Sequence, residues 1–166
     1  MDTGLLLGRV VLGLLMAAHG SQKLFGWFGG YGIAGTGGFM ESLGFKPGKF
    51  FAAAAGATEF AGGALIALGL LGPLGPAMVI STMVVAIATV HWAHGPFAQN
   101  NGYELPLLYA VGAASIALIG YGAYSIDALL QLTWSETVIW AVLALGVLGG
   151  AGNLLVRKTG PVEAHV

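Results

Sequence analysis

Five ionisable side chains lie within or beside long apolar stretches of the sequence: His19, Lys23, Glu59, His91 and Glu104. An ionisable group inside a membrane is energetically costly, which makes it a functional candidate by default. Histidine and a buried carboxyl group can take up and release protons, and lysine can donate hydrogen bonds to ligand oxygens. These residue types predict a catalytic, proton-handling or ligand-binding site. A hydrogen-bonded network that only joins helices is the alternative.

The composition indicates that these residues belong to a membrane protein. Of the 166 residues, 57% are hydrophobic and 8% are charged, whereas soluble domains carry about 25% charged residues. A spanning helix needs about 20 mostly apolar residues. Five segments approach this length, and they predict an all-α integral membrane protein with spans at residues 5–27, 49–71, 74–92, 104–121 and 137–156.

The five candidate residues are expected to meet in one half of the membrane. We call the face where the chain begins side one and the opposite face side two. His19 and Lys23, four residues apart, share a helix face near side two. Glu59 lies roughly 15 Å inside the second span, which begins on side two, and Lys23 and His19 are the cations expected to compensate its charge. His91 and Glu104 flank the side-two connection between the third and fourth spans.

The distribution of basic residues predicts the orientation of the chain. Lys46, Lys49, Arg157 and Lys158 all fall on side two, while the side-one connections 72–76 and 122–136 contain no Lys or Arg. Basic loops are retained on the cytoplasmic face. The amino terminus is therefore expected outside the cell and the carboxyl terminus in the cytoplasm.

The connection 28–48 combines glycines with aromatic residues. This pattern favours a loop that lies at the interface or re-enters the membrane, with a short helix at 39–43, and a flexible connector is the alternative. Aromatic side chains near the ends of spans can flank a ligand ring or form an interfacial belt. The candidates for binding a cofactor ring are Phe25, Trp27, Tyr31 and Tyr103.

Arg9 lies near the side-one end of the first span. A long basic side chain there can extend its charge to the membrane surface. We expect a structural anchor, with Asp127 as a partner on the same side.

An ordered set of short motifs makes the chain resemble the DoxX family of bacterial membrane proteins. The motifs are Arg9 to Gly13, His19-Gly20, Lys23 to Gly30, Phe39 with Leu43-Gly44, Glu59 to Gly63, Leu68 to Leu70 with Pro73, His91, Gly102 to Glu104, Gly120 and Tyr124 to Asp127. The resemblance implies a four-helix bundle over residues 1–130 in the bacterial inner membrane. Residues 131–166 would add a fifth helix and a short basic tail. Family members are associated with thiosulfate:quinone oxidoreductase subunits and redox-stress complexes.

Quinone binding is the function expected from these features together, because quinone reduction needs protons close to the ring. The sequence has no cysteine and no flavin or nicotinamide fingerprint, so electrons would come from a partner protein or a small reductant. A non-catalytic anchor or assembly subunit and a small-solute or proton-coupled transporter are the alternatives. His19, Glu59, His91 and Glu104 could also supply metal ligands, but they lack the usual Glu-x-x-His spacing, and metal content stays open. The expected partners are lipid, a redox protein and a second copy of the chain, and not nucleic acid.

Overall fold

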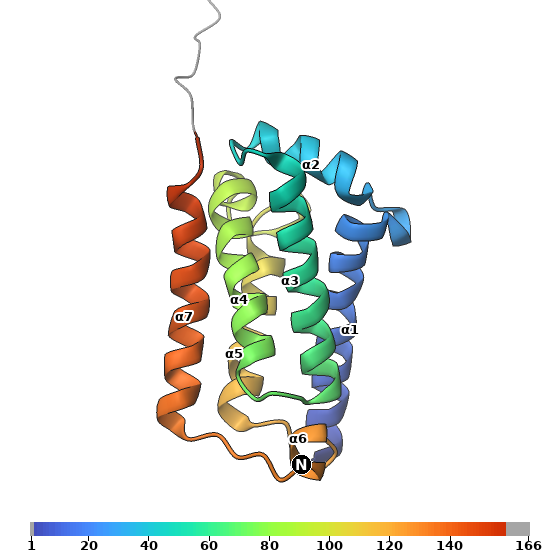
Figure 1. Ribbon diagram of the computed structural model, residues 1–166, viewed down its shortest axis with the longest axis vertical. Coiled ribbons are helices and arrows are strands. Elements are labelled where there is room, and N and C mark those ends of the chain that lie inside the picture. Colours follow the sequence, from blue (N-terminus) through green and yellow to red (C-terminus); the bar gives the residue numbers. More distant parts are fainter. Residues whose placement is uncertain (1, 159–166) are drawn as a thin grey trace, which may run out of the picture.

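The computed structural model describes residues 2–158 and shows an up-and-down bundle of helices (Figure 1). Four helices are long and apolar enough to cross a membrane, and α5 is a shorter apolar helix. The prediction of an all-α integral membrane protein is confirmed. The bundle helices are α1 (Asp2–Phe25), α3 (Gly48–Leu68), α4 (Leu74–Ala86, continued by a π-helical turn, η2, Ile87–His91), α5 (Glu104–Ile119) and α7 (Glu136–Leu155).

Paired glycines bring α1 and α3 into close contact. Gly13 lies against Gly63, and a Cβ atom built on Gly13 would stand 2.5 Å from the Gly63 carbonyl oxygen. Two helical turns further along α1, a Cβ on Gly20 would stand 2.6 Å from the carbonyl oxygen of Gly56. Small residues permit this approach of two backbones, which is a common basis of helix association in lipid. The seam holds the two helices that carry Lys23 and Glu59.

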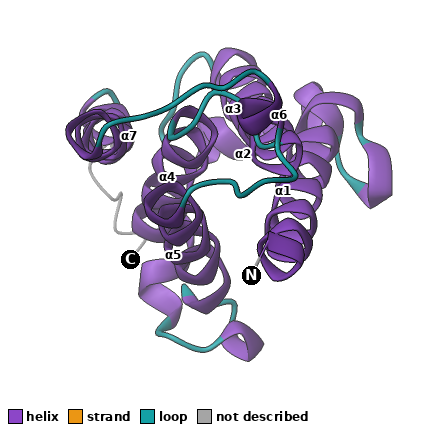
Figure 2. Ribbon diagram, turned by 90° about the horizontal axis from the view of Figure 1, so that it is seen from below, coloured by secondary structure: helices purple, strands orange, loops and turns teal. Residues whose placement is uncertain are grey.

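The fifth spanning helix, α7, packs along α4 through a second seam of small residues. Cβ atoms on Gly146 and Gly150 would stand 2.5 and 2.6 Å from the carbonyl oxygens of Ala77 and Ser81. Figure 2 shows α7 beside α4, on the side of the bundle away from α1. Because α7 joins the bundle directly, it can contribute side chains to a site among the other helices.

Helix α2 (Gly32–Ser42) lies across the side-two end of the bundle (Figure 1). This helix is longer than the short helix expected at 39–43, and the flexible connector considered as an alternative is wrong. Its glycines permit close packing, since a Cβ on Gly37 would stand 3.1 Å from the backbone nitrogen of Lys49 on α3. Packing on α3 therefore overrides the low helix propensity of glycine.

Arg9 and Asp127 both hold the side-one end together, but they do so separately. Arg9 is only 1% exposed, and its guanidinium donates to the carbonyl oxygens of Ala67 and Tyr124. Asp127 accepts hydrogen bonds from the amides of Leu71 and Gly72, both at 2.8 Å. The expectations that Arg9 extends to the surface and pairs with Asp127 are therefore wrong. The carbonyl groups at the carboxyl end of α3 carry partial negative charge, which explains why a buried guanidinium is stable there.

The same end is closed by two further hydrogen bonds. Trp134 Nε1 donates to Asp127 at 2.9 Å, and the Tyr121 hydroxyl donates to the Gly72 carbonyl oxygen at 2.7 Å. Burial, reinforced by the Asp127 carboxylate, raises the pKa of the Tyr121 hydroxyl above its ordinary value. This hydroxyl is therefore a permanent donor at physiological pH, and the side-one end is a structural closure.

Candidate functional site

An ion pair between Lys23 and Glu59 joins α1 to α3 in the half of the bundle nearer α2. The Lys23 side chain is 26% exposed and the Glu59 side chain 5%. Gly56, one turn from Glu59, provides the room, because a Cβ there would stand 3.1 Å from the Cβ of Lys23. Among residues 2–158 this is the one salt bridge present. The expectation that Lys23 compensates the buried Glu59 is confirmed.

The ion pair borders a cavity of about 170 Å³ that is otherwise mainly apolar. Helices α1, α2, α3, α4 and α7 all supply residues to its wall. Hydroxyl and amide groups add polar contacts at a few points of that wall, and these come from Thr58, Ser81, Thr82, Thr89 and Asn153. An apolar cavity with a few convergent polar groups is typical of a small-molecule site.

The cavity borders two residues on the outer face of the bundle. Ala54 of α3 and Asn153 of α7 both line the cavity, and both are exposed at the protein surface. In Figure 1 these two helices flank α4, and α7 packs on α4. In a membrane, this face of the spanning helices meets lipid. A ligand dissolved in the bilayer could therefore reach the cavity from the side.

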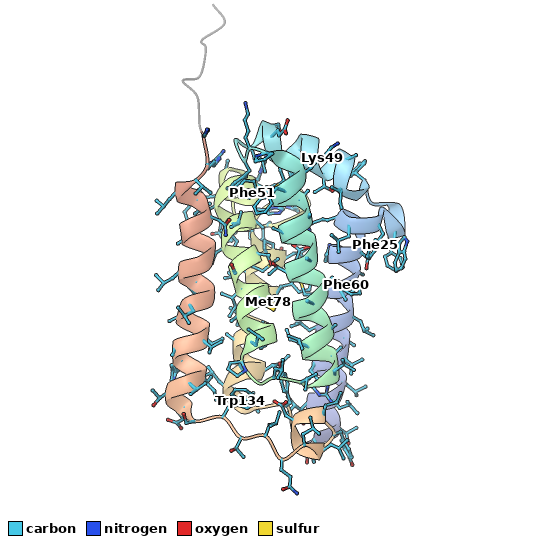
Figure 3. The ribbon with its side chains drawn as sticks, in the orientation of Figure 1. Phe25, Lys49, Phe51, Phe60, Met78 and Trp134 are labelled. Carbon is cyan, nitrogen blue, oxygen red and sulfur yellow. The ribbon has the colours of Figure 1, made fainter. Side chains whose placement is uncertain are left out.

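Aromatic residues from α2, from the α2–α3 turn and from the start of α3 form the side-two wall of the cavity. Phe39, Phe45 and Phe51 line it, and Phe45 is 1% exposed and packs at 5.3 Å, centroid to centroid, from Phe51. Figure 3 shows Phe51 close to the side-two end of the bundle, beside α4. Flat aromatic side chains in this position suit a planar ring.

The end of α4 departs from α-helical geometry where it passes the cavity. The π-helical turn η2 contains Thr89 and Val90, and both residues line the cavity. The hydroxyl of Thr89 donates to the Val85 carbonyl oxygen at 2.8 Å. Turns of this kind occur often at functional sites.

Comparison with known proteins decides the family. The DoxX family profile matches residues 4–92. A relative from Escherichia coli (strain K12), Inner membrane protein YqjF, is 32% identical over 136 residues, which cover 80% of this chain and 96% of the relative. The chain belongs to the DoxX family. No solved structure matches it.

The family match contains most of the cavity. Lys23, Glu59 and the aromatic wall lie within residues 4–92 of this DoxX protein, whereas Asn153 of α7 lies outside them. The proposed division between residues 1–130 and 131–166 stays a prediction. Because α7 lines the cavity with Asn153, the fifth helix takes part in the candidate site.

His91 and Glu104 do not reach the ion pair or line the cavity. His91 Nδ1 lies 2.7 Å from the Asn101 carbonyl oxygen, and a Glu104 carboxylate oxygen accepts from the Ala98 amide at 2.8 Å. Both residues organise the connection between α4 and α5. The expectation that they join the pocket is wrong, because both side chains are hydrogen-bonded to backbone groups of this connection.

His19 also lies away from the ion pair's cavity. Its ring is exposed and makes an edge-to-face contact with Tyr109 of α5, at 5.8 Å between centroids. Its helix turn is shared with Lys23, but only Lys23 reaches α3. Among residues 2–158 no three His, Asp or Glu side chains gather closely enough to hold a metal ion.

The aromatic residues predicted to bind a ring lie elsewhere. Phe25, Trp27 and Tyr31 are 53%, 57% and 83% exposed and lie between the end of α1 and the start of α2. Figure 3 shows Phe25 at this corner of the bundle. Tyr103 stacks on Trp92 at 5.3 Å, centroid to centroid, in the α4–α5 connection. None of the four lines the cavity. Their positions at helix ends match the interfacial belt that was the alternative.

The sequence carried a weak signal for the threonine and phenylalanine residues that do line the cavity. Thr82 and Thr89 are seven residues apart, so they share a face of α4. Thr58 directly precedes Glu59, and Phe39, Phe45 and Phe51 are spaced six residues apart across the α2–α3 turn. The threonine periodicity could have indicated a polar helix face, but only the fold shows that this face meets the phenylalanines.

Proposed function

We propose that this DoxX protein binds a quinone in the cavity beside the Lys23–Glu59 ion pair. The carrying observation is the combination of that partly buried pair with mainly apolar walls that reach the lipid-facing surface between α3 and α7. A quinone is soluble in lipid, has a flat apolar ring and carries two carbonyl oxygens. The cavity reaches the lipid-facing surface, has apolar and aromatic walls for the ring, and offers the Lys23 ammonium as a donor to a carbonyl oxygen.

The residues of the cavity suggest how the ring would be held. The Lys23 ammonium has hydrogen-bond donors beyond the one it directs at Glu59, so it can donate to one quinone oxygen. The hydroxyl group of Thr58 is a further donor in the wall. Phe51 and Phe39 supply apolar and aromatic surface for the ring. A water-soluble ligand would find little else to bind in such walls.

A redox role would follow from binding if a partner supplies electrons. Reduction of a quinone to the quinol takes up two electrons and two protons. The Lys23–Glu59 pair could hold protons next to the oxygens, and the electrons would come from a redox partner protein. In this proposal side two faces the cytoplasm, so the protons would be drawn from there.

Ligand binding to the purified protein tests the proposal. A short-chain ubiquinone analogue should raise the melting temperature of the detergent-solubilised protein in a saturable way, as expected for a ligand that binds only the folded state. Phe51→Leu and Glu59→Gln should each raise the Kd of the analogue, obtained from this saturation curve, at least about tenfold. That change corresponds to about 1.4 kcal/mol of binding free energy. Phe50→Leu is the matched control, because Phe50 is adjacent in sequence, 64% exposed and absent from the cavity wall.

The same experiment separates a binding site from a structural anchor. If the ion pair only joins α1 to α3, the analogue will not stabilise the wild-type protein, and Glu59→Gln will change the melting temperature alone. If the analogue has the same Kd for the wild type, Phe51→Leu and Glu59→Gln, quinone binding lies outside this cavity. Either result would reject the proposal.

A further inference from the structure

Four basic residues gather around the turn between α2 and α3: Lys46, Lys49, Arg157 and Lys158. We call this group the basic rim. Lys46, Lys49 and Lys158 are exposed, and Arg157 is half-buried. Figure 3 shows Lys49 at the side-two end of the bundle, beside α2, and α7 ends near the same end of the bundle on the other side of α4. The rim therefore combines cations from segments that are more than a hundred residues apart in the sequence.

Hydrogen bonds fix the position of the two cations that follow α7. The Arg157 Nε atom donates to the carbonyl oxygen of Leu43. The Lys158 amide donates to the carbonyl oxygen of Gly44 at 2.9 Å. Because both contacts reach the α2–α3 turn, Arg157 and Lys158 are held next to Lys46. The remaining guanidinium nitrogens of Arg157 have no hydrogen bond within residues 2–158.

The basic rim is not neutralised by the described part of the protein. None of its four side chains forms a salt bridge within residues 2–158. One acidic residue, Glu41 in the last turn of α2, lies beside this turn, and its carboxylate accepts a hydrogen bond from the Gly48 amide at 3.0 Å. The rim thus carries an excess of positive charge that an anion could compensate.

Exposed apolar side chains lie next to the rim. Phe50 follows Lys49 and is 64% exposed, and Leu155 and Val156 precede Arg157 and are 88% and 54% exposed. A soluble phosphate would meet only the cations. An anionic phospholipid would meet the cations with its phosphate and the apolar side chains with its acyl chains.

We propose that the basic rim is a binding site for the headgroup of an anionic phospholipid. Basic residues next to a spanning helix attract anionic lipids, and each contributes about fivefold in affinity near the membrane surface. The site is separate from the cavity of the Lys23–Glu59 pair, since none of the four rim residues lines that cavity. Arg157 and Lys158 give the end of α7 a role in lipid binding besides its packing on α4.

Competition between two lipids tests this proposal. The purified full-length protein is incubated in mixed micelles with equal amounts of phosphatidylglycerol and phosphatidylethanolamine, and retained lipids are counted by native mass spectrometry. The wild type should retain phosphatidylglycerol preferentially, and Lys46→Gln/Lys49→Gln/Lys158→Gln should reduce the preference at least about tenfold. The variant with arginine at the same three positions should keep it. Glu136→Gln, an exposed charge change at the opposite end, is the control for a general electrostatic effect.

A double variant and a competition with inorganic phosphate complete the test. If the triple variant is poorly folded, Lys46→Gln/Lys49→Gln leaves the hydrogen-bonded segment after α7 intact and should still lower the preference. Inorganic phosphate, added at the same concentration as the lipid, should not displace phosphatidylglycerol. Equal retention of the two lipids by the wild type, an unchanged preference in the glutamine variants, or displacement by phosphate would each overturn the proposal.

Discussion

At the scale of single residues, the Lys23–Glu59 pair is the feature that most closely links stability to the proposed function. Glu59 is 4% exposed, so its charge depends on Lys23. Charged groups taken out of water are tolerated when they are paired, and removal of one partner leaves the other uncompensated. The pair can therefore stabilise the α1–α3 seam and still take part in binding.

This dependence predicts a non-additive pair of substitutions. Lys23→Met should lower stability by about 3 kcal/mol, because the buried Glu59 carboxylate loses its cation. Glu59→Gln should be milder, since Lys23 is partly exposed and can reach a more polar environment. The double variant Lys23→Met/Glu59→Gln should be more stable than Lys23→Met alone. Thermal melting of the four proteins in one detergent measures this, and additive losses would mean that the two side chains do not interact.

At the scale of helices, glycine decides which surfaces meet. Helices α1 and α3 approach along Gly13, Gly20, Gly56 and Gly63, and α7 approaches α4 along Gly146 and Gly150. Apolar side chains alone do not drive helices together in lipid, because the lipid is equally apolar. Close backbone packing adds to the interhelical hydrogen bonds as a source of attraction, and here it brings α1 against α3 and α7 against α4 beside the cavity.

The glycine seam predicts a sharp contrast between two substitutions on α1. Gly13→Ala should destabilise the protein by about 1–3 kcal/mol, because the new methyl group would overlap the α3 backbone and force the helices apart. Gly8→Ala is the control, since nothing lies within 4 Å of a Cβ at that position. Alanine also favours helix more than glycine does, so Gly8→Ala should be neutral or slightly stabilising. Equal melting temperatures for the two variants would exclude tight packing at this seam.

At the scale of the whole molecule, the ends of the bundle differ in chemistry. The side-one end is closed by the buried Arg9 and Asp127 hydrogen bonds. The side-two end carries α2, the basic rim and the nearby cavity. The five bundle helices alternate in direction, and the two described ends of the chain lie at opposite ends of the bundle (Figure 1).

This asymmetry predicts the orientation in the bacterial inner membrane. A reporter fused to the carboxyl terminus should read as cytoplasmic, because basic residues are retained on that side. A reporter inserted in the connection 122–136 should read as periplasmic. The pair of fusions controls for expression, since each reports through the same protein. A periplasmic signal from the carboxyl-terminal fusion would reverse the predicted orientation.

The sequence by itself determined the membrane class and the approximate spans, and it named Lys23 and His19 as the candidate cations for Glu59. Hydrophobic length and the cost of buried charge are local properties that a sequence displays directly. Helical spacing placed Lys23 on the correct face, but it also placed His19 there, and only the approach of α3 and α5 separates the two side chains.

Only the tertiary structure decided which residues surround the cavity. His91 and Glu104 were expected there because they lie in the same half of the membrane as the cavity. Instead, their side chains form hydrogen bonds with backbone groups of the α4–α5 connection. Conversely, Asn153 of α7 reaches the cavity because Gly146 and Gly150 let α7 rest on α4. Such contacts depend on side-chain volume at interfaces between distant segments, and the hydrophobic pattern of each segment alone does not encode which face meets which neighbour.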